Sequence, residues 1–371
     1  MSSWRECKLW DVAEVKGGKR LPKGELLTTE KTPHPYIRIT DFDGHKINLS
    51  AIQYVTEEVQ KSISRYIVNK QDIIISNVGT IGLCAKIPDE LDNANLTENC
   101  VKLVFDKNKI DTNFLYYHLI SPDTQELINS LDVGSTQPKL PIYNIQKIDI
   151  SLPPLEEQKA IAEVLCSFDD KIDLLHRQNQ TLESLAQTLF RQWFIEEAKE
   201  EWEEVTLSDV MELKYGKDHK HLNDGKIPIY GSGGIMRYGN TAIYENESIL
   251  IPRKGTLSNI FYVDEPFWTV DTIFWSKINS EKISGKLLFE FLKTLNFSNM
   301  NVGSAVPSLT TKVLNEISFA LPSLEEQEEF KQYTDNAWDK VKQNKKQIQT
   351  LENLRDTLLP KLLSGEVRVK I

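Results

Sequence analysis

The sequence lacks long apolar runs, low-complexity tracts and clustered cysteines. No stretch of about 18 apolar residues is present, which predicts that no helix spans a membrane. The start, MSSWRECKLWDVAE, is charged and lacks the apolar segment of a signal peptide, so we expect a cytoplasmic protein. The four cysteines form no CxxC pair and are expected to be free thiols: Cys7, Cys84, Cys100 and Cys166.

Sequence signatures of enzymes are also missing. There is no GxxxxGK(S/T) loop and no GxGxxG after a strand-like run, so neither ATP nor a dinucleotide is expected. The phrase Asn/Asp-Pro-Pro-aromatic, which resembles an amino-methyltransferase active site, is absent as well. His219 and His221 form an HxH pair without a third metal ligand in view. We therefore expect a non-catalytic chain that binds no cofactor and no metal.

The net charge of −10 argues at first against a nucleic-acid partner, because phosphate binding needs positive charge. The charge is distributed unevenly, however. Residues 151–201 carry 5 basic and 11 acidic groups, whereas residues 1–150 carry 18 and 20, and residues 202–320 carry 12 and 14. Within the acidic segment, the pair Asp169-Asp170 is expected on a solvated helix face. The two long segments are near balance, so each can carry a basic face.

One seven-residue phrase occurs twice, as LPPLEEQ at 152–158 and LPSLEEQ at 321–327. The phrases are 169 residues apart, and a second register with an offset of 198 aligns the segments that begin at Trp4 and Trp202. The chain is therefore a tandem duplication whose first copy is longer by 29 residues, the difference between the two offsets. Further matches are VGSTQPKL (133–140) with VGSAVPSL (302–309), and QTLESLAQTL (180–189) with QTLENLRDTL (349–358).

Each copy has two unlike parts. Short β-type runs broken by Gly, Pro, Asn and Asp predict mainly β domains, whereas residues 155–195 and 324–363 have a helical apolar period and predict long helices. Ser323 with Glu326 forms a capping-box signature at the second helix start. The expected organisation is a β-rich domain at 1–150, a helical segment at 151–201, a second β-rich domain at 202–320 and a C-terminal helical segment at 321–371.

The apolar positions of both helices alternate in steps of four and three, which is a coiled-coil spacing. Each seam contains one asparagine, Asn179 or Asn344, and a seam asparagine can fix alignment. We predict antiparallel packing about a pseudo-two-fold axis, with paired residue numbers that add to 523. The principal seam residues are Leu165, Ile172, Leu175, Asn179, Leu182, Val341, Asn344, Ile348, Leu351 and Leu358. The expected fold class is α+β, an internal tandem repeat of two mainly β domains separated by this antiparallel coiled coil.

This order of elements closely resembles the specificity subunit of type I restriction-modification enzymes. The resemblance rests on a variable β-rich unit, then GSTQPKL, then LPPLEEQ running into a long helix that ends QTLFRQWF, with the whole arrangement repeated once. It implies that each β-rich unit is a target recognition domain for one half of a split sequence in double-stranded DNA. It also implies helices that set the spacing, two docked modification (methyltransferase) subunits and, in the full complex, restriction subunits with nuclease and translocase activity.

Three groups of residues in each copy are candidates for DNA contact. The basic turns at 16–23 and 214–221 place Gly next to Lys, giving backbone and charge access to phosphate, although solvated turns are the alternative. The Gly-Thr turns at 79–80 and 255–256, and the polar loop before each helix, could present polar groups to base edges. The candidates are Lys16, Lys19, Arg20, Lys23, Asn77, Thr80, Ser135, Thr136, Gln137, Lys139, Lys214, Lys217, Lys220, His221, Arg253, Lys254, Thr256, Ser304 and Ser308.

Two other hypotheses about function are compatible with the sequence. The paired helices could form a non-catalytic scaffold that binds other proteins, while the β-rich units bind peptide or carbohydrate. The other hypothesis is a nuclease that acts alone, which no motif supports. Arg253 and Lys254 have no basic counterpart beside Asn77, so the equivalence of the two Gly-Thr turns is also open.

Overall fold

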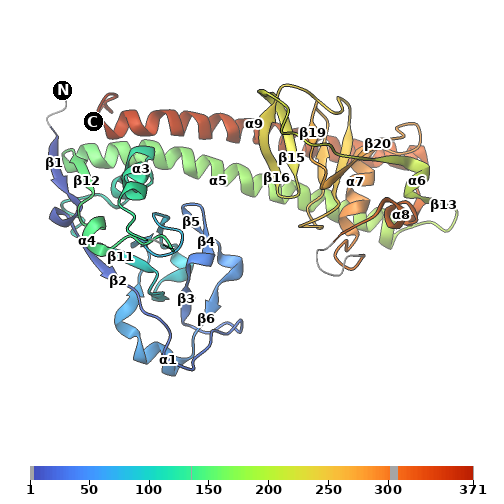
Figure 1. Cartoon of the computed structure of the whole chain (residues 1–371). Helices are drawn as coiled ribbons and strands as arrows, with labels where there is room; N and C mark the ends of the chain where they lie inside the picture. The colour runs from blue at the N-terminus through green and yellow to red at the C-terminus, as the bar shows by residue number, and fades with distance from the viewer. Residues whose placement is uncertain (1–3, 135, 301–307, 371) are drawn as a thin grey trace. The chain divides into compact units, whose positions relative to one another are not determined.

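The computed structural model describes residues 4–134, 136–300 and 308–370. The chain divides into two compact units, one formed by Met1–Leu174 with Gln347–Ile371 (unit 1) and the other by Leu175–Lys346 (unit 2). Helices α5 (Leu155–Arg191) and α9 (Leu324–Leu363) contribute a segment to each unit (Figure 1). Among the described residues, no helix is both long and apolar enough to cross a membrane.

Unit 1 is built on two four-stranded sheets and a strand pair. One sheet has the order β2-β11-β8-β9, the other has the order β6-β3-β10-β7, and β1 pairs antiparallel with β12. The strands are β1 (Arg5–Lys8), β2 (Ala13–Gly17), β3 (Pro35–Ile37), β6 (Gln53–Tyr54), β7 (Ile67–Val68), β8 (Ile73–Ser76), β9 (Cys84–Lys86), β10 (Ala94–Leu96), β11 (Cys100–Phe105) and β12 (Asp149–Leu152), with the hairpin β4 (Phe42–Asp43) and β5 (Lys46–Ile47). The helices are α1 (Glu57–Ser62), α2 (Thr112–Ile120), α3 (Pro122–Ser130) and α4 (Ile142–Ile145).

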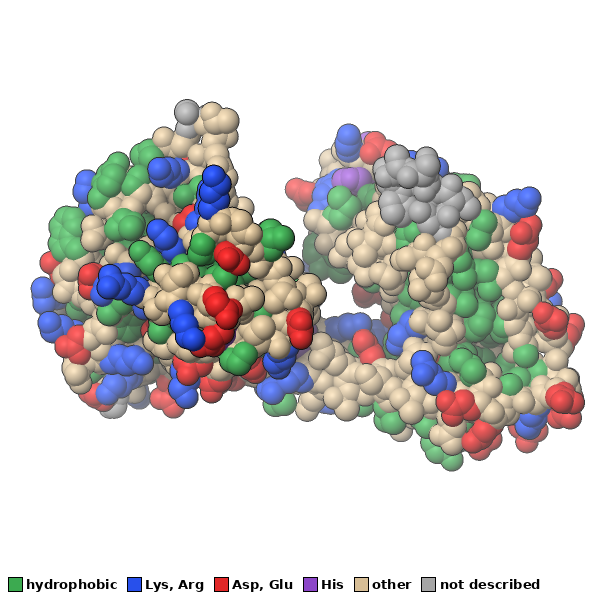
Figure 2. All heavy atoms as spheres, turned by 90° about the horizontal axis from the view of Figure 1, so that it is seen from below, with side chains coloured by type: hydrophobic (Ala, Val, Ile, Leu, Met, Phe, Trp, Pro, Cys, Tyr) green, Lys and Arg blue, Asp and Glu red, His purple; other side chains and the backbone are tan. Residues whose placement is uncertain are grey.

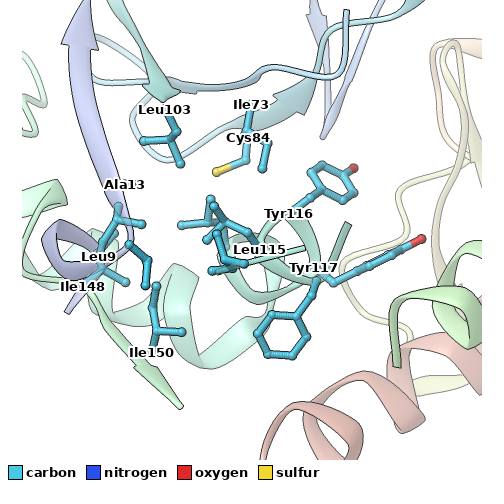
Figure 3. Packing of buried hydrophobic residues seen from close by; sticks show 14 of the residues in the cluster. Leu9, Ala13, Ile73, Cys84, Leu103, Leu115, Tyr116, Tyr117, Ile148 and Ile150 are labelled. Carbon is cyan, nitrogen blue, oxygen red and sulfur yellow. The ribbon is translucent and has the colours of Figure 1, made fainter. Parts of the chain in front are cut away.

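The main core of unit 1 lies between the β2-β11-β8-β9 sheet and its helices. Figure 3 shows apolar side chains from these strands and from α2 pointing toward one another, including Leu103 and Leu115. Leu165, Leu359 and Leu362 belong to the same buried cluster. The sheet is therefore fixed to both long helices by apolar burial, which is the dominant favourable term in folding.

Unit 2 repeats this topology. Its strand order β14-β20-β17-β18 matches β2-β11-β8-β9, the three-stranded sheet β16-β15-β19 takes the place of the second sheet, and β13 pairs with β21 as β1 does with β12. The strands are β13 (Glu203–Thr206), β14 (Met211–Tyr215), β15 (Asp224–Gly231), β16 (Gly234–Gly239), β17 (Ser248–Pro252), β18 (Phe261–Val263), β19 (Trp268–Thr269), β20 (Ile273–Ile278) and β21 (Ser318–Leu321). The helices are α6 (Leu207–Val210), α7 (Gly285–Thr294) and α8 (Thr311–Asn315). The predicted internal repeat of mixed, mainly β units is confirmed.

The repeated LEEQ phrase joins the β-rich part of unit 1 to its helices. The buried Glu157 accepts a hydrogen bond from Trp4 Nε1 (3.1 Å) and forms an ion pair with Arg368 (2.5 Å). The buried Gln158 accepts from the N–H of Asp111 (2.8 Å), the residue that caps α2, and donates to Pro153 O (2.8 Å). Since Trp4, Asp111 and Arg368 are far apart in the sequence, the phrase links distant segments of the chain within unit 1.

Unit 2 repeats these contacts with its own copy of the phrase. Glu326 accepts from Trp202 Nε1 (2.9 Å) and pairs with Lys199 (2.5 Å). Gln327 accepts from the N–H of Ser284 (3.1 Å), directly before α7. Ser323 N–H donates to Glu326 (2.9 Å) and Glu326 N–H donates to Ser323 Oγ (3.3 Å), so the predicted capping box is confirmed.

The helical seam places asparagine opposite asparagine. Asn344 Nδ2 donates to Asn179 Oδ1 at 2.9 Å, and both side chains are buried, so the predicted pairing is confirmed at this position. Trp193 and Phe330 fit the same register with ring centroids 6.1 Å apart. Leu165, Ile172, Leu175, Val341 and Ile348 are also buried, and Leu182, Leu351 and Leu358 are half-buried.

The expectation that Asp169 lies on a solvated flank is wrong. Asp169 accepts a hydrogen bond from Tyr117 Oη (2.6 Å) and one from Arg355 (2.7 Å), and its side chain is only 22% exposed. Packing of α2 and α9 against α5 brings these three residues together, and the guanidinium neutralises the carboxylate. Asp170 is exposed, as expected.

The predicted free thiols are confirmed, since all four cysteines lie within the described residues and are unpaired. Cys84 and Cys100 are buried, and burial raises the pKa of Cys84 to about 12. These two thiols behave as small apolar groups in the core.

Candidate nucleic-acid interface

The first basic turn follows β2 in unit 1 and keeps its charges at the surface. The side chains of Lys16, Lys19, Arg20 and Lys23 are exposed. Lys16 pairs with Glu14 (3.0 Å), and Arg20 pairs with Glu98 (2.5 Å). Exposed pairs of this kind contribute little to stability, so both cations can exchange a carboxylate for a phosphate.

Two backbone amides of this turn are already bonded to neighbouring strands. Gly18 N–H donates to Cys100 O (2.9 Å), and Lys19 N–H donates to Leu96 O (2.8 Å). A Cβ on Gly18 would lie 2.0 Å from Thr97 O, so the glycine is required by close packing of the turn on the neighbouring strand. The amides of Gly18 and Lys19 are therefore not free to donate to a phosphate, while the exposed side chains of the turn are available.

The second basic turn has the same backbone. Gly216 N–H donates to Ile273 O (3.0 Å), Lys217 N–H donates to Thr269 O (2.9 Å), and a Cβ on Gly216 would lie 2.0 Å from Val270 O. The two turns are thus structurally equivalent. The candidates Lys217, Lys220 and His221 are exposed, while Lys214 is half-buried and pairs with Glu212.

The HxH pair of this turn is used in packing. Arg237 Nε donates to His219 Nδ1 at 3.2 Å, and the His221 ring packs edge-on against Trp268 with centroids 5.8 Å apart. Across the described ranges of the chain, no three His, Cys, Asp or Glu side chains are grouped as metal ligands would be.

The two Gly-Thr turns are equivalent, which the sequence left open. Gly79 and Gly255 both have a φ of 87°, in the left-handed region that glycine adopts without strain. In unit 1 the residue two before the glycine is Asn77, whose backbone carbonyl accepts from Leu140 N–H (2.8 Å). In unit 2 the backbone carbonyl of Arg253 accepts from Leu309 N–H in the same way (2.9 Å).

The polar loop before each helix is brought against its Gly-Thr turn. Val78 bridges to Lys139 in unit 1, and Lys254 bridges to Ser308 in unit 2. The Gln137 amide lies 3.4 Å from the Cβ position of Gly79. The candidates Thr80, Thr136, Gln137, Lys139, Lys254 and Thr256 are exposed, Asn77, Arg253 and Ser308 are half-buried, and Ser135 and Ser304 lie outside the described residues.

An aromatic residue that the sequence analysis missed joins two of the groups in unit 2. The Arg253 guanidinium lies 5.5 Å from the centroid of the Tyr215 ring, and Tyr215 is 53% exposed. The basic turn and the Gly-Thr turn therefore form one surface. Tyr215 stands between Lys214 and Gly216, and this position inside a basic turn is the signal that could have revealed it.

Charges of both signs are mixed on the face of the molecule shown in Figure 2, where Lys and Arg side chains are interspersed with Asp and Glu. The exposed candidates of unit 1 carry cations, hydroxyls and the amide of Gln137, and those of unit 2 carry cations and the hydroxyl of Thr256. This composition suits contacts to individual phosphates and base edges.

The same three groups of polar residues are carried by equivalent strands in both units. The family model described as type I restriction modification DNA specificity domain matches residues 1–184 and 199–353. The chain therefore belongs to the family of type I restriction-modification specificity subunits.

Relatives match this chain along almost its whole length, and a solved structure has a similar fold. The type I restriction enzyme MjaIX specificity subunit of Methanocaldococcus jannaschii is 26% identical over 99% of this chain and 94% of the relative. The MjaVIII specificity subunit of the same organism is 28% identical over 99% and 93%. The fold is similar to that of a crystal structure of a type I restriction-modification S subunit from M. genitalium, with a TM-score of 0.62, 23% identity and coverage of 100% of this chain and 97% of that chain.

Proposed function

We propose that this subunit reads an asymmetric bipartite target in double-stranded DNA, one half with each β-rich unit. The observation that carries the proposal is the duplicated surface. In both units the pre-helix loop bridges to the Gly-Thr turn, and the basic turn is bonded to the strand that pairs with the strand before that turn. We further propose the domain limits 1–150, 151–201, 202–320 and 321–371, with recognition assigned to the first and third segments.

The side chains on the two surfaces differ, which supports two different half-sites. Unit 2 presents Arg253, whose fork of donors suits the O6 and N7 atoms of guanine. Unit 1 carries Asn77 at that place and presents the exposed amide of Gln137, which suits adenine. A palindromic target would need equal surfaces, so the target is split and asymmetric.

The partners supply the chemistry in this proposal. The helices set the distance between half-sites and dock two methyltransferase subunits, which bind the methyl donor, and restriction subunits join in the full complex. Because the chain has a net charge of −10, the free subunit binds DNA weakly and the partners' basic surfaces complete the clamp. The complex acts on DNA in the cytoplasm. Nanomolar binding by the isolated chain at physiological salt would contradict this division of roles.

A methylome tests the proposal. The chain is expressed with a matching modification subunit in a methylation-free host, and modified adenines are mapped by sequencing. A single split motif with a fixed undefined gap is expected. A stable complex of the two proteins that leaves the DNA unmodified would favour the protein-binding scaffold instead.

A further inference from the structure

Unit 1 contains a cationic pocket that the surfaces described above do not explain. Its volume is about 320 Å³, and its lining residues are Lys16, Gly17, Arg65, Tyr66, Leu96 and Lys102. Half of the lining residues are cationic and none carries a carboxylate. Arg65 and Lys102 were not among the sequence-predicted contacts.

The strand pairing places two of these cations directly opposite each other. Lys102 on β11 is the cross-strand partner of Lys16 on β2. Like charges in such a position destabilise a sheet, so the pair is better explained by an anion that binds between them. Lys16 pairs with Glu14 at 3.0 Å, whereas Lys102 Nζ donates to the neutral carbonyl of Ile67 (2.7 Å) and pairs with no carboxylate among the described residues.

The third cation lies outside the two paired strands. Arg65 lies in the short 3₁₀ helix Ser64–Tyr66, is exposed, and makes no ion pair or side-chain hydrogen bond with any described residue. The bond from Lys102 to Ile67 holds this segment against the sheet. Lys19 Nζ lies 5.8 Å from the Tyr66 ring centroid, so the pocket is continuous with the first basic turn.

Unit 2 fills the corresponding place with aromatic rings. Lys214, the counterpart of Lys16, stands opposite Trp275 instead of a lysine. Trp275 is buried, donates to Tyr215 O (3.2 Å), and packs on Tyr244 with centroids 4.8 Å apart. Since a tryptophan serves the fold at this position, the lysine of unit 1 is not needed for the sheet itself.

We propose that this pocket binds a phosphate group and, on the basis of the proposed function, that the group is a backbone phosphate of the half-site read by unit 1. The cations that line the pocket attract the negative charge of a phosphodiester, and the planar guanidinium of Arg65 can donate two parallel hydrogen bonds to its oxygens. The volume is at the small end of the range for ligand sites, which suits a phosphate with its adjoining sugar.

The test measures DNA binding by the complex of this chain with its methyltransferase subunits. Two duplexes are compared, one carrying and one lacking the methylated motif, across a salt series. Arg65→Gln and Lys102→Met each remove one charge from the pocket. Lys107→Gln is the matched control, because it removes an exposed charge just beyond β11 without lining the pocket.

Both pocket variants should weaken binding about 3- to 10-fold on either duplex, because a phosphate contact carries no sequence information. The slope of log affinity against log salt should fall by about 1 for each charge removed. The Lys107 control should have the same affinity and the same salt slope as the parent chain on both duplexes. Because Arg65 is exposed, its variant tests the pocket even if the substitution inside β11 harms folding.

Unchanged affinity and slope in the Arg65 variant would overturn the proposal, and so would weakening confined to the motif duplex. Calorimetry with inorganic phosphate distinguishes a site for free phosphate from a site for a DNA backbone phosphate. Millimolar phosphate that binds the parent but not the Lys102 variant, with duplex binding unaltered, would assign the pocket to free phosphate and overturn the DNA assignment. A parent complex that binds neither duplex would instead refute the proposed function.

Discussion

The two units share a frame, which consists of the same strand order and the same contacts of the LEEQ phrase, and they differ on the surfaces that they present. Their frames make the same contacts, from the Trp–Glu hydrogen bond to the glutamine that holds the segment before α2 or α7. At the surface, by contrast, Lys102 faces Lys16 in unit 1 where Trp275 faces Lys214 in unit 2. The comparison teaches that buried polar contacts fix the backbone of the surface, so its side chains can change without altering the fold.

A second difference lies beneath the surfaces. Tyr117 on α2 donates to Asp169, whereas the residue at the corresponding place on α7 is Glu290, six residues after Ser284 as Tyr117 is after Asp111. Glu290 is fully buried and pairs with Lys293 at 3.3 Å, but its oxygens accept no hydrogen bond from any described residue. Unit 2 therefore contains a costly buried carboxylate where unit 1 has a satisfied network.

The largest predicted effect tests whether the frames are equivalent. Gln158→Ala and Gln327→Ala should each destabilise their own unit by about 2–4 kcal/mol, because each leaves a partly buried N–H and a buried carbonyl without partners. Urea unfolding of the variants measures the loss. The exposed neighbours provide controls, since Glu156→Ala and Glu325→Ala should change stability by less than about 1 kcal/mol. A large loss in only one unit would show that the frames are not equivalent.

The seam asparagines give the next largest effect. Asn344→Leu should destabilise unit 2 by about 1–3 kcal/mol, because Asn179 is left buried without its partner. Replacing both asparagines with leucine should restore stability or raise it, at the expense of a defined register. Denaturant unfolding compares the single and double variants, with the exposed Gln343→Ala as a control. A double variant as unstable as the single one would refute the account of the pair.

Glu290 predicts a pH dependence that sharpens the difference between the units. Burial raises the pKa of Glu290 to about 7, against a partial opposing effect of Lys293. The folded unit therefore holds this proton more tightly than the unfolded chain does. The resulting stability is fully present below the unfolded pKa of 4.5 and is lost as pH rises through about 7.

Glu290→Gln should accordingly stabilise unit 2 at pH 8 by about 1–2 kcal/mol and flatten its stability between pH 5 and 8, roughly the titration range of the carboxyl. Thermal unfolding across this pH range provides the measurement. Tyr117→Phe in unit 1 is the comparison variant, which should leave the pH profile unchanged. A profile that keeps its slope in the Gln variant would exclude Glu290 as the titrating group.

Sequence reasoning succeeded where the pattern is local or repeated. The helical period gave α5 and α9, the capping signature gave Ser323 with Glu326, and the single asparagine of each seam gave the register. It failed where long-range packing decides. The amide of Gly18 is bound to a strand far along the chain, and Asp169 is covered by α2. In the sequence, Lys102 is a single polar residue in an apolar strand. Its place opposite Lys16 is known only from the pairing of β11 with β2.

The most direct test of the central claim changes one surface at a time and reads the methylome. Arg253→Ala alters unit 2 and Gln137→Ala alters unit 1, and each variant is expressed with the same modification subunit. We expect each substitution to relax bases in one half of the motif and leave the other half and the gap unchanged, at a cost of about 1–3 kcal/mol for each base pair affected. Changes in the same half for both variants, or no change in either half, would contradict the assignment of one half-site to each unit.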